Sequence, residues 1–432
     1  MDLQEFAREQ AQTLAPLLEQ LNRSLWDFAE FGYQEFRSSK EIARVLEEEG
    51  FQVELGVGGI PTAIRASYGQ GHPVIGILGE YDALPNLSQK AGCPRQEPIP
   101  DKDCGHGCGH NSLGAGAVGA AMVAKRYLQQ SKKPGTICFL GCPAEETGFG
   151  KAFLAREGCF ADLDACELMN VGVNYLREHI ISQARVHYAY LDCGGSAPNV
   201  VQEKSSLLYF VRAPKLTQCA EILERIKKIA QGAALMTETQ VKISVSGGLS
   251  DMIPNQTLAE VLSESLVQQG GPDFTQQDYE LAQSFLEAIP EPIRKEWVQK
   301  AADAAGEPLS EFEKHPLDRS VAPFDPALMN LVVTGSSDVG DVSRIVPTPQ
   351  VTLTATVPGT SPRTWQFTAQ VGTSLGGRAS VAAAKVLGLA CEKLFDDPAL
   401  VQKAKEELAR CCPEGYQCPI PEGMDYASVN PG

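Results

Sequence analysis

Cysteine and histidine are concentrated in one short stretch of the chain, Cys104-Gly105-His106-Gly107-Cys108-Gly109-His110-Asn111. Thiolate sulfur and imidazole nitrogen are ligands that transition-metal ions prefer, and the intervening glycines allow the backbone to fold round an ion. Cys108 and His110 are close enough in the chain to share one ion. The four candidate ligands of this stretch cannot easily all reach one metal, so further ligands must come from elsewhere. A flexible loop rich in glycine and histidine is the alternative interpretation.

A pair of carboxylates, Glu145-Glu146, directly follows an apolar segment that predicts a strand over 136–140. Open α/β sheets bind ligands beyond the carboxyl ends of their strands, where the cysteine-containing loop is also expected. Adjacent side chains on a loop point in different directions, so one carboxylate can bind metal while the other takes a proton from the metal's water. An exposed Glu-Glu turn is the alternative, because charged residues are mostly exposed.

The segment Glu80-Tyr81-Asp82-Ala83-Leu84-Pro85 follows another predicted strand, over 74–78, and adds carboxylates at a further strand end. Asp82 is a candidate to orient a metal-binding imidazole, because such histidines usually donate their second ring N–H to a carboxylate. An aspartate that caps the following turn is an equally good interpretation of this residue alone.

The elements that must position these residues alternate between helical and strand patterns, which predicts an α/β fold. Asn111 or Ser112 is expected to cap a helix whose first half, 113–124, is almost wholly small or apolar and therefore buried. The loop over 83–109 is long enough to be functional or disordered. The other expected elements of this part are helices over 14–31, 40–49 and 151–157 and strands over 52–57 and 63–67.

A second pattern begins near Cys166 and has the order αββαβ. It would form a βαββαβ two-layer sandwich if a strand preceded it, but no room is left between Asp164 and Cys166. We therefore predict a catalytic domain of 1–165 and 256–432 and an inserted domain of 166–255. The elements expected in the insert are helices over 167–178 and 216–234 and strands over 185–192, 206–212 and 240–246, and the return to the first domain includes 328–333, 351–355 and a helix over 381–394.

The composition indicates a globular protein and argues against binding to nucleic acid or to membranes. The chain has 432 residues, of which 43% are hydrophobic, and a formal charge of −17, so it should fold compactly and repel nucleic acid and anionic membranes. No apolar run is long enough to span a membrane. The mixed, charged N-terminal residues and the odd number of cysteines, 13, favour a cytoplasmic protein with reduced thiols. Cys411, Cys412 and Cys418, in a proline-containing tail, have no assignment.

Several runs of the chain resemble the M20 metallopeptidase family, and within it the amidohydrolase branch. The resemblance covers nearly the whole chain. The runs that carry it are GEYDALP, GHGCGHN followed by a small-residue helix, CPAEE followed by G-x-G-K, ELMNVGVNYLREH, APNVV, FVRAP, GSSDVGDVS and TWQFTAQ.

The resemblance implies an amide hydrolase with two metal ions, built as a zinc-peptidase-like α/β domain whose mixed sheet is flanked by helices. It also implies an inserted α+β two-layer lid that dimerises, here without its first strand. By the same resemblance Asn199 contacts the substrate's carboxylate with help from Arg212, although Asn199 also suits a turn beside Pro198. The roles implied for the other matched residues are metal ligation by Cys108, His110 and Glu146, general-base catalysis by Glu145 and support by Asp82.

Two departures from the family pattern bear on the metal site. Between Ala165 and Glu167 the family carries several dozen residues, including a ligand histidine and the first lid strand. Arg363 stands where the family has its last ligand histidine, and arginine cannot bind metal because it stays protonated. With His106 or Glu80 as the remaining candidates, the sequence predicts one Mn²⁺ or Zn²⁺ ion in preference to two.

The leading hypothesis is a metal-dependent amidohydrolase for an N-acyl or N-aroyl amino acid such as p-aminobenzoyl-glutamate, with impaired or altered activity. It would act on a small molecule and form a homodimer or a heterodimer with a related chain. The competing hypothesis is a catalytically degenerate homologue that serves as a partner subunit, or a non-functional deletion variant. A metal-storage or metal-sensing protein that uses the loop from Cys104 to His110 is the third.

Overall fold

The computed structural model describes residues 2–146, 150–154, 180–192, 206–236, 240–243, 245, 247–332 and 337–420. The chain divides into two compact units. The first contains Met1–Gly150, Pro254–Met329 and Val346–Cys411, and the second contains Lys151–Ile253, Asn330–Ile345 and Cys412–Gly432.

A four-stranded mixed sheet forms the centre of the first unit, with the strand order β1-β2-β4-β3. β2 runs antiparallel to both β1 and β4, whereas β3 and β4 are parallel. In the parallel pair Gly79 lies beside Gly141, so the segments that follow β3 and β4 leave the sheet at the same edge. The strands are β1 (Gln52–Leu55), β2 (Ile64–Gln70), β3 (Val74–Gly79) and β4 (Gly135–Gly141).

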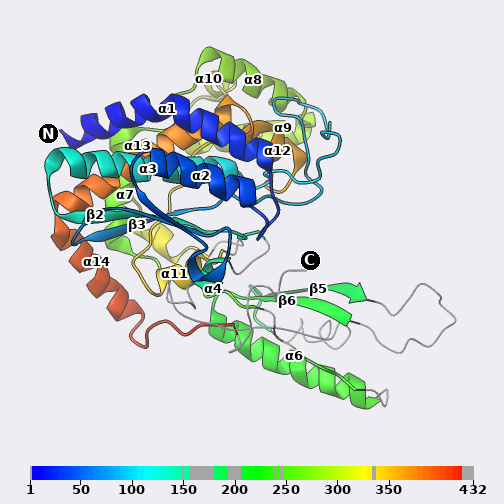
Figure 1. Ribbon diagram of the computed structural model, residues 1–432. Helices are drawn as coiled ribbons and strands as arrows, with labels where there is room; N and C mark the ends of the chain where they lie inside the picture. The colour runs from blue at the N-terminus through cyan, green and yellow to red at the C-terminus, as the bar shows by residue number, and fades with distance from the viewer. Residues whose placement is uncertain are drawn as a thin grey trace. The chain divides into compact units, whose positions relative to one another are not determined.

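Helices α1 (Leu3–Phe28), α2 (Phe36–Glu48), α3 (His110–Ser131) and α13 (Ser374–Asp396) gather over one face of this sheet (Figure 1). α13 packs along α3 and α1, and small residues allow the close approach. A Cβ added to Gly119 in α3 would lie 2.7 Å from the Cβ of Ala384 in α13. This side of the sheet is therefore a dry core that fixes the start of α3.

A second group of helices in the first unit encloses its own apolar core, which includes Phe285, Val298 and Phe312. The remaining helical segments of this unit are α7 (Gln256–Gln269), α8 (Gln276–Glu287), α9 (Glu291–Ala305), α10 (Leu309–Phe312), α12 (Trp365–Val371), α14 (Pro398–Cys411) and the 3₁₀ segment η1 (Val57–Gly59).

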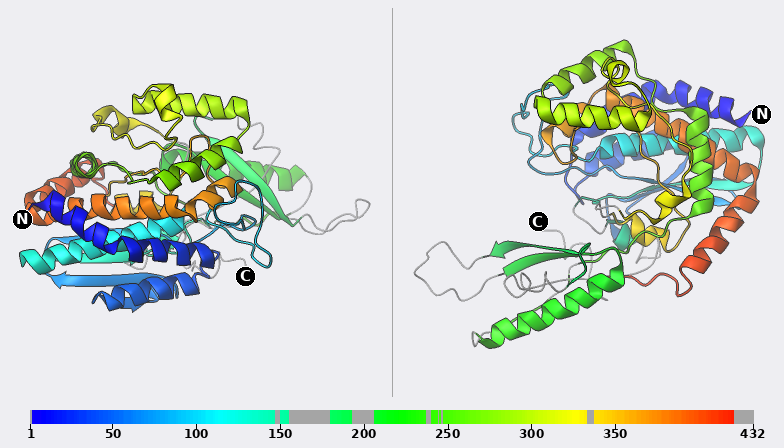
Figure 2. Two further views of the ribbon diagram at one scale, coloured as in Figure 1. Left: turned by 90° about the horizontal axis from the view of Figure 1, so that it is seen from above. Right: turned by 180° about the vertical axis from the view of Figure 1, so that it is seen from behind.

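The second unit contains the antiparallel pair β5 (Arg185–Asp192) and β6 (Ser206–Arg212) with α6 (Leu216–Met236) alongside (Figure 2). Its apolar core is formed by Ala184, Val186, Tyr209, Ile222 and Ile226. The remaining short segments are α4 (Gly150–Leu154), which begins in the first unit, η4 (Pro326–Asn330), which crosses the boundary, and α11 (Val339–Ser343).

Buried polar contacts explain why the second unit takes in residues far along the chain. Lys151 Nζ lies 2.6 Å from Asp338 Oδ1, and both side chains are fully buried. Ser250 donates its hydroxyl to Asp341 Oδ1 at 2.6 Å. These bonds place 330–345 with the second unit, whereas the sequence-based boundaries placed that segment in the catalytic domain. The role of this unit as a lid, and its lack of a first strand, stay predictions.

The mixed sheet flanked by helices agrees with the fold class expected from the sequence. The start of α3 does not agree with the expected cap, because the helix begins at His110 and its N-cap is Gly109 at φ +79°. Asn111 donates instead to Asn22 Oδ1, and Ser112 also donates to that oxygen. The described residues of 240–246 form no strand, and the expected helix over 167–178 lies outside the described residues.

Within the part of the chain that the structure describes, none of the helices combines the length and the apolar character that crossing a membrane requires.

Candidate metal centre

The candidate site lies where β3 and β4 end and α3 begins, all within the first unit. Glu80 and Asp82 follow β3, and Glu145 and Glu146 follow β4 by a few residues. Parallel strands deliver their carboxyl-terminal segments to one edge, so both pairs of carboxylates reach the first turn of α3. His110 is the first residue of that helix.

The loop before α3 is held close to a neighbouring loop by its glycines. Leu84 and Gly105 exchange two backbone hydrogen bonds, at 2.9 and 3.1 Å. A Cβ on Gly105 would lie 2.0 Å from the carbonyl oxygen of Leu87, which no side chain tolerates. The glycines noted in the sequence therefore serve close backbone packing, and this packing fixes where Cys108 and His110 lie.

His110 is the centre of a buried polar cluster. Its Nδ1–H donates to Asp82 Oδ1 at 2.8 Å, because a carboxylate can only accept. Its Nε2 lies 3.3 Å from Glu80 Oε2 and 3.8 Å from Glu145 Oε2. One ligand atom from each of Glu80, His110 and Glu145 lies within 4.8 Å of the others. An imidazole nitrogen with two carboxylate oxygens suits Mn²⁺ or Zn²⁺, so these residues fit a divalent ion.

The electrostatics of His110 reflect its carboxylate neighbours. Burial by itself would lower the pKa of this imidazole, but Asp82, Glu80 and Glu145 outweigh burial and raise the pKa to about 10. The carboxylates round His110 therefore strongly favour a positive charge at this place. A protonated imidazole supplies that charge, and a bound cation would supply it as well.

Two further carboxylates hold the loop that presents Glu145. Asp82 Oδ2 accepts from the backbone N–H of Glu146 at 2.8 Å, and Glu35 Oε1 accepts from the N–H of Ala144 at 2.8 Å. Ala144 has a φ of +59°, a conformation that a non-glycine residue adopts only when its surroundings impose it. Glu145 is thus fixed from both sides.

Glu35 was not among the residues expected from the sequence. It is fully buried, and burial followed by repulsion from Asp82 raises the pKa of its carboxyl to about 8. Its other oxygen accepts from Thr62 Oγ1 at 2.9 Å. A single acidic residue between two helices carries no local signal of such a role.

Cys108 and Glu146 lie close together. The side chain of Arg363 covers them on the solvent side. Arg363 Nη2 lies 2.9 Å from Glu146 Oε2. The Cys108 thiol lies near both the Glu146 carboxylate and the Arg363 guanidinium and interacts electrostatically with each. Burial and the neighbouring Glu146 carboxylate raise the pKa of Cys108 to about 12. Of the three expected metal ligands, only His110 therefore belongs to the described three-residue cluster.

The other expected residues lie apart from this cluster or outside the described residues. His106 Nε2 bonds to the Leu25 carbonyl at 3.0 Å, and burial lowers the pKa of this imidazole to about 4. Of the two remaining candidates, Glu80 belongs to the cluster and His106 does not. Asn199 lies outside the described residues, and Arg212 ends β6 in the second unit.

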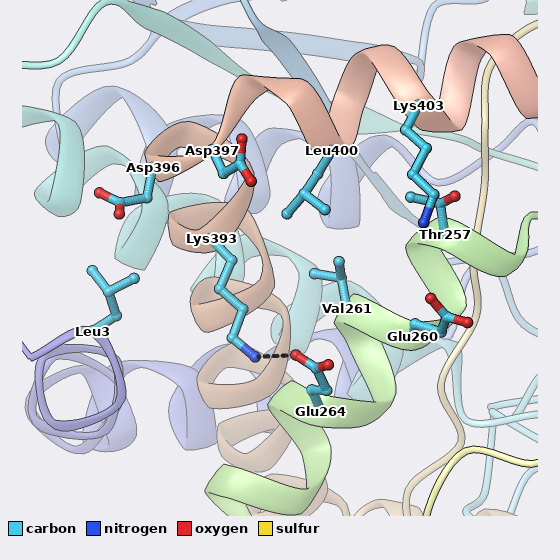
Figure 3. Close-up of a pocket in the computed structure, with 10 residues that line it drawn as sticks. All are labelled: Leu3, Thr257, Glu260, Val261, Glu264, Lys393, Asp396, Asp397, Leu400 and Lys403. Carbon is cyan, nitrogen blue, oxygen red and sulfur yellow. Dashed lines mark hydrogen bonds and ion pairs between the residues drawn. The ribbon is translucent and has the colours of Figure 1, made fainter.

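A cavity of about 270 Å³ lies between α7, α13 and α14 in the first unit (Figure 3). Its charged residues are of both signs, and Lys393 pairs with Glu264 at 3.4 Å. No residue of the His110 cluster lines it. Four carboxylates and two lysines line it, and we assign it no function.

Residues 76–424 match the model of peptidase family M20/M25/M40. The chain belongs to this family. It is 37% identical to one of the subunits of p-aminobenzoyl-glutamate hydrolase from Escherichia coli K12, over 93% of this chain and 94% of that protein. It is 27% identical to the Xaa-Arg dipeptidase of Mus musculus, over 60% of this chain and 70% of that protein.

The fold is also that of solved family members. A dinuclear metal-binding peptidase of the M20 family from Bacillus subtilis superposes with a TM-score of 0.53 at 16% identity, over 89% of this chain and 99% of that one. The family and the fold class expected from the sequence are thus confirmed.

The alignment with the Escherichia coli protein contains gaps in this chain. It runs over 452 positions, whereas 93% of 432 residues is about 402, so about 50 positions in total face no residue of this chain. A missing segment between Ala165 and Glu167 stays a prediction from the sequence.

Proposed function

We propose that this protein is a metal-dependent amidohydrolase that cleaves the amide bond of an N-acyl or N-aroyl amino acid. The observation that carries the proposal is the convergence of Glu80, His110 and Glu145 beside the paired strand ends. The Escherichia coli relative is named for the hydrolysis of p-aminobenzoyl-glutamate, which makes this compound the first substrate to test.

His110 and Glu80 would hold the divalent ion, Mn²⁺ or Zn²⁺, with Glu145 at its side. When bound, such an ion supplies Lewis-acid polarisation of the amide carbonyl and a more acidic water. Asp82 orients the imidazole by accepting from Nδ1, which leaves Nε2 directed at the cluster.

Glu145 is our candidate for the general base. Its side chain is 13% exposed, the most accessible of the three, and its backbone is held by the contacts of Ala144 and Glu146. It would take a proton from the attacking water as the new C–O bond forms. It would then give that proton to the amide nitrogen as the C–N bond breaks.

The experiment is to measure release of p-aminobenzoate from p-aminobenzoyl-glutamate with added Mn²⁺. Glu145→Gln should lower the rate by at least about 100-fold, since a positioned acid-base group contributes roughly 10²–10⁴-fold. Exposed Glu9→Gln in α1 is the matched control and should keep the full rate. Equal rates for the wild type and Glu145→Gln would remove the assignment of Glu145.

A second candidate function is that of a partner chain without catalysis of its own. The Arg363–Glu146 ion pair and the positions missing relative to the Escherichia coli protein favour it. That relative is named as one subunit of its hydrolase, so a heterodimer with a related chain is the form to test beside a homodimer. Wild-type protein that binds Mn²⁺ but cleaves no amide, alone or with the related chain, would favour this function.

A further inference from the structure

Arg363 is fixed by its backbone as well as by its ion pair. Its N–H donates to the carbonyl oxygen of Gly107 at 2.7 Å, which joins its loop to the loop before α3. Its φ is +61°, a left-handed conformation that is unfavourable for a non-glycine residue. A Cβ on Gly107 would lie 3.2 Å from Arg363 Cα, so any larger residue there would have to displace the Arg363 loop by a few tenths of an ångström. The surrounding structure therefore imposes the position of the Arg363 backbone, from which the side chain reaches Glu146.

The ion pair made from this position has one buried and one accessible partner. The side chain of Glu146 is 1% exposed, whereas that of Arg363 is 64% exposed. A buried carboxylate without a cation is strongly unfavourable, and the guanidinium supplies that cation from the solvent side. The same guanidinium lies close enough to the sulfur of Cys108 to interact with it electrostatically.

Glu146 and Cys108 are the donors that a second metal ion beside the His110 cluster would need. The permanently charged guanidinium of Arg363 already lies beside both residues. A divalent ion entering there would be repelled by its like charge. Arginine cannot become a ligand itself, because its guanidinium has no acceptor and stays protonated. These residues do not fit a second ion, although a dinuclear peptidase shares the fold.

We propose that the Arg363 guanidinium takes the place of a second metal ion between Glu146 and Cys108, so that this chain binds a single divalent ion at His110 and Glu80, beside Glu145. The inference rests on the ion site of the proposed function. It predicts that one substitution, Arg363→His, removes the blocking charge, adds an imidazole and opens the second position. Histidine tolerates left-handed backbone better than most residues, so the loop should keep its conformation.

The test is metal counting on the full-length protein. Wild type and Arg363→His are stripped with a chelator and titrated with Mn²⁺, and the bound ion is counted by calorimetry and elemental analysis. We expect a single ion per chain for the wild type and a second for Arg363→His. Arg363→Lys, which keeps the charge and adds no ligand, should bind a single ion, and Arg363→His with Glu146→Gln should lose the second.

Cobalt gives an independent readout that needs no activity. The His110 cluster contains no sulfur, so wild type loaded with Co²⁺ should show no thiolate-to-cobalt charge-transfer band. Arg363→His should show that band through Cys108, and Arg363→His with Cys108→Ser should not. The spectrum thus reports which position is filled.

Two ions in the wild type, or a thiolate band in its Co²⁺ form, would overturn the inference. A single ion in Arg363→His would also overturn it. Because these readouts need no turnover, a protein with the expected ion counts that cleaves no amide would contradict the proposed function and leave the inference in place.

Discussion

Asp82 links the two parts of the site through its two carboxylate oxygens. One accepts from the ring of His110 and the other from the backbone of Glu146, each at 2.8 Å. The side chain is fully buried, so neither bond can be replaced by one to bulk water. The residue therefore positions the imidazole of His110 and the backbone of Glu146 at the same time.

Asp82→Asn should weaken Mn²⁺ binding by roughly 10–100-fold, the usual cost of losing the partner of a ligand histidine. An amide replaces one oxygen with an NH2 group, so either the ring N–H of His110 or the backbone N–H of Glu146 would face a donor instead of an acceptor. The measurement is the Mn²⁺ dissociation constant by competition with a chromogenic chelator, together with the melting temperature of the metal-free protein. Exposed Asp303→Asn in α9 is the control. Unchanged Mn²⁺ affinity in Asp82→Asn would contradict a positioning role.

The residue types of the site could be predicted from the sequence, but the partners of those residues could not. Strand ends followed by Asp82 and by Glu145 predicted where carboxylates gather, because parallel strands deliver them to one edge. The spacing of Cys108 and His110 suggested a shared ion, yet the neighbours of Cys108 are Glu146 and Arg363. That choice depends on a loop more than 200 residues away in the chain, which no local pattern reveals.

At the scale of elements, helix α13 determines how the first unit is packed. It lies against α3, α1 and α7, so nearly all of its faces are covered. The sequence predicted a helix here from its periodicity. It did not predict that polar residues of this helix would be buried. Glu392 lies on this helix with its side chain fully buried and, among the described residues, with no hydrogen-bond partner for either oxygen.

Burial raises the pKa of Glu392 to about 9, whereas the unfolded chain keeps a value near 4.5. Between these two pH values the folded protein holds a proton that the unfolded chain has lost. The free energy of unfolding must therefore fall as the pH rises through this window. At pH 7 the cost is about 3 kcal/mol, since each pH unit above 4.5 contributes roughly 1.4 kcal/mol.

Glu392→Gln should remove this cost, because the amide is neutral at every pH and close in size. We expect a large stabilisation at pH 8 and almost none near pH 4.5, measured as urea unfolding at a series of pH values. The surface substitution Glu9→Gln should change stability little throughout. A gain that is equal at both ends of the range would show that packing, and not ionisation, accounts for it.

For the whole molecule, the two units differ greatly in how much apolar surface they enclose. The mixed sheet of the first unit is covered by long helices, whereas the described sheet of the second unit has two strands. A two-stranded sheet is only marginally stable by itself, and an open strand edge invites pairing with another chain. The small apolar core round Tyr209 and Ile226 contributes little further stability to this sheet.

The amides of β5 and β6 should therefore exchange with deuterium much faster than those of β2 and β4. A difference in opening free energy of about 3 kcal/mol would lower protection by roughly 100-fold. The measurement is hydrogen exchange by mass spectrometry on peptides from 185–192 and 206–212, at low and high protein concentration. If a second chain covers the strand edge, protection should rise with concentration, while that of β2 and β4 stays constant. Equal protection of both sheets at the lowest concentration would contradict the prediction and mean that the second unit is stable without a partner.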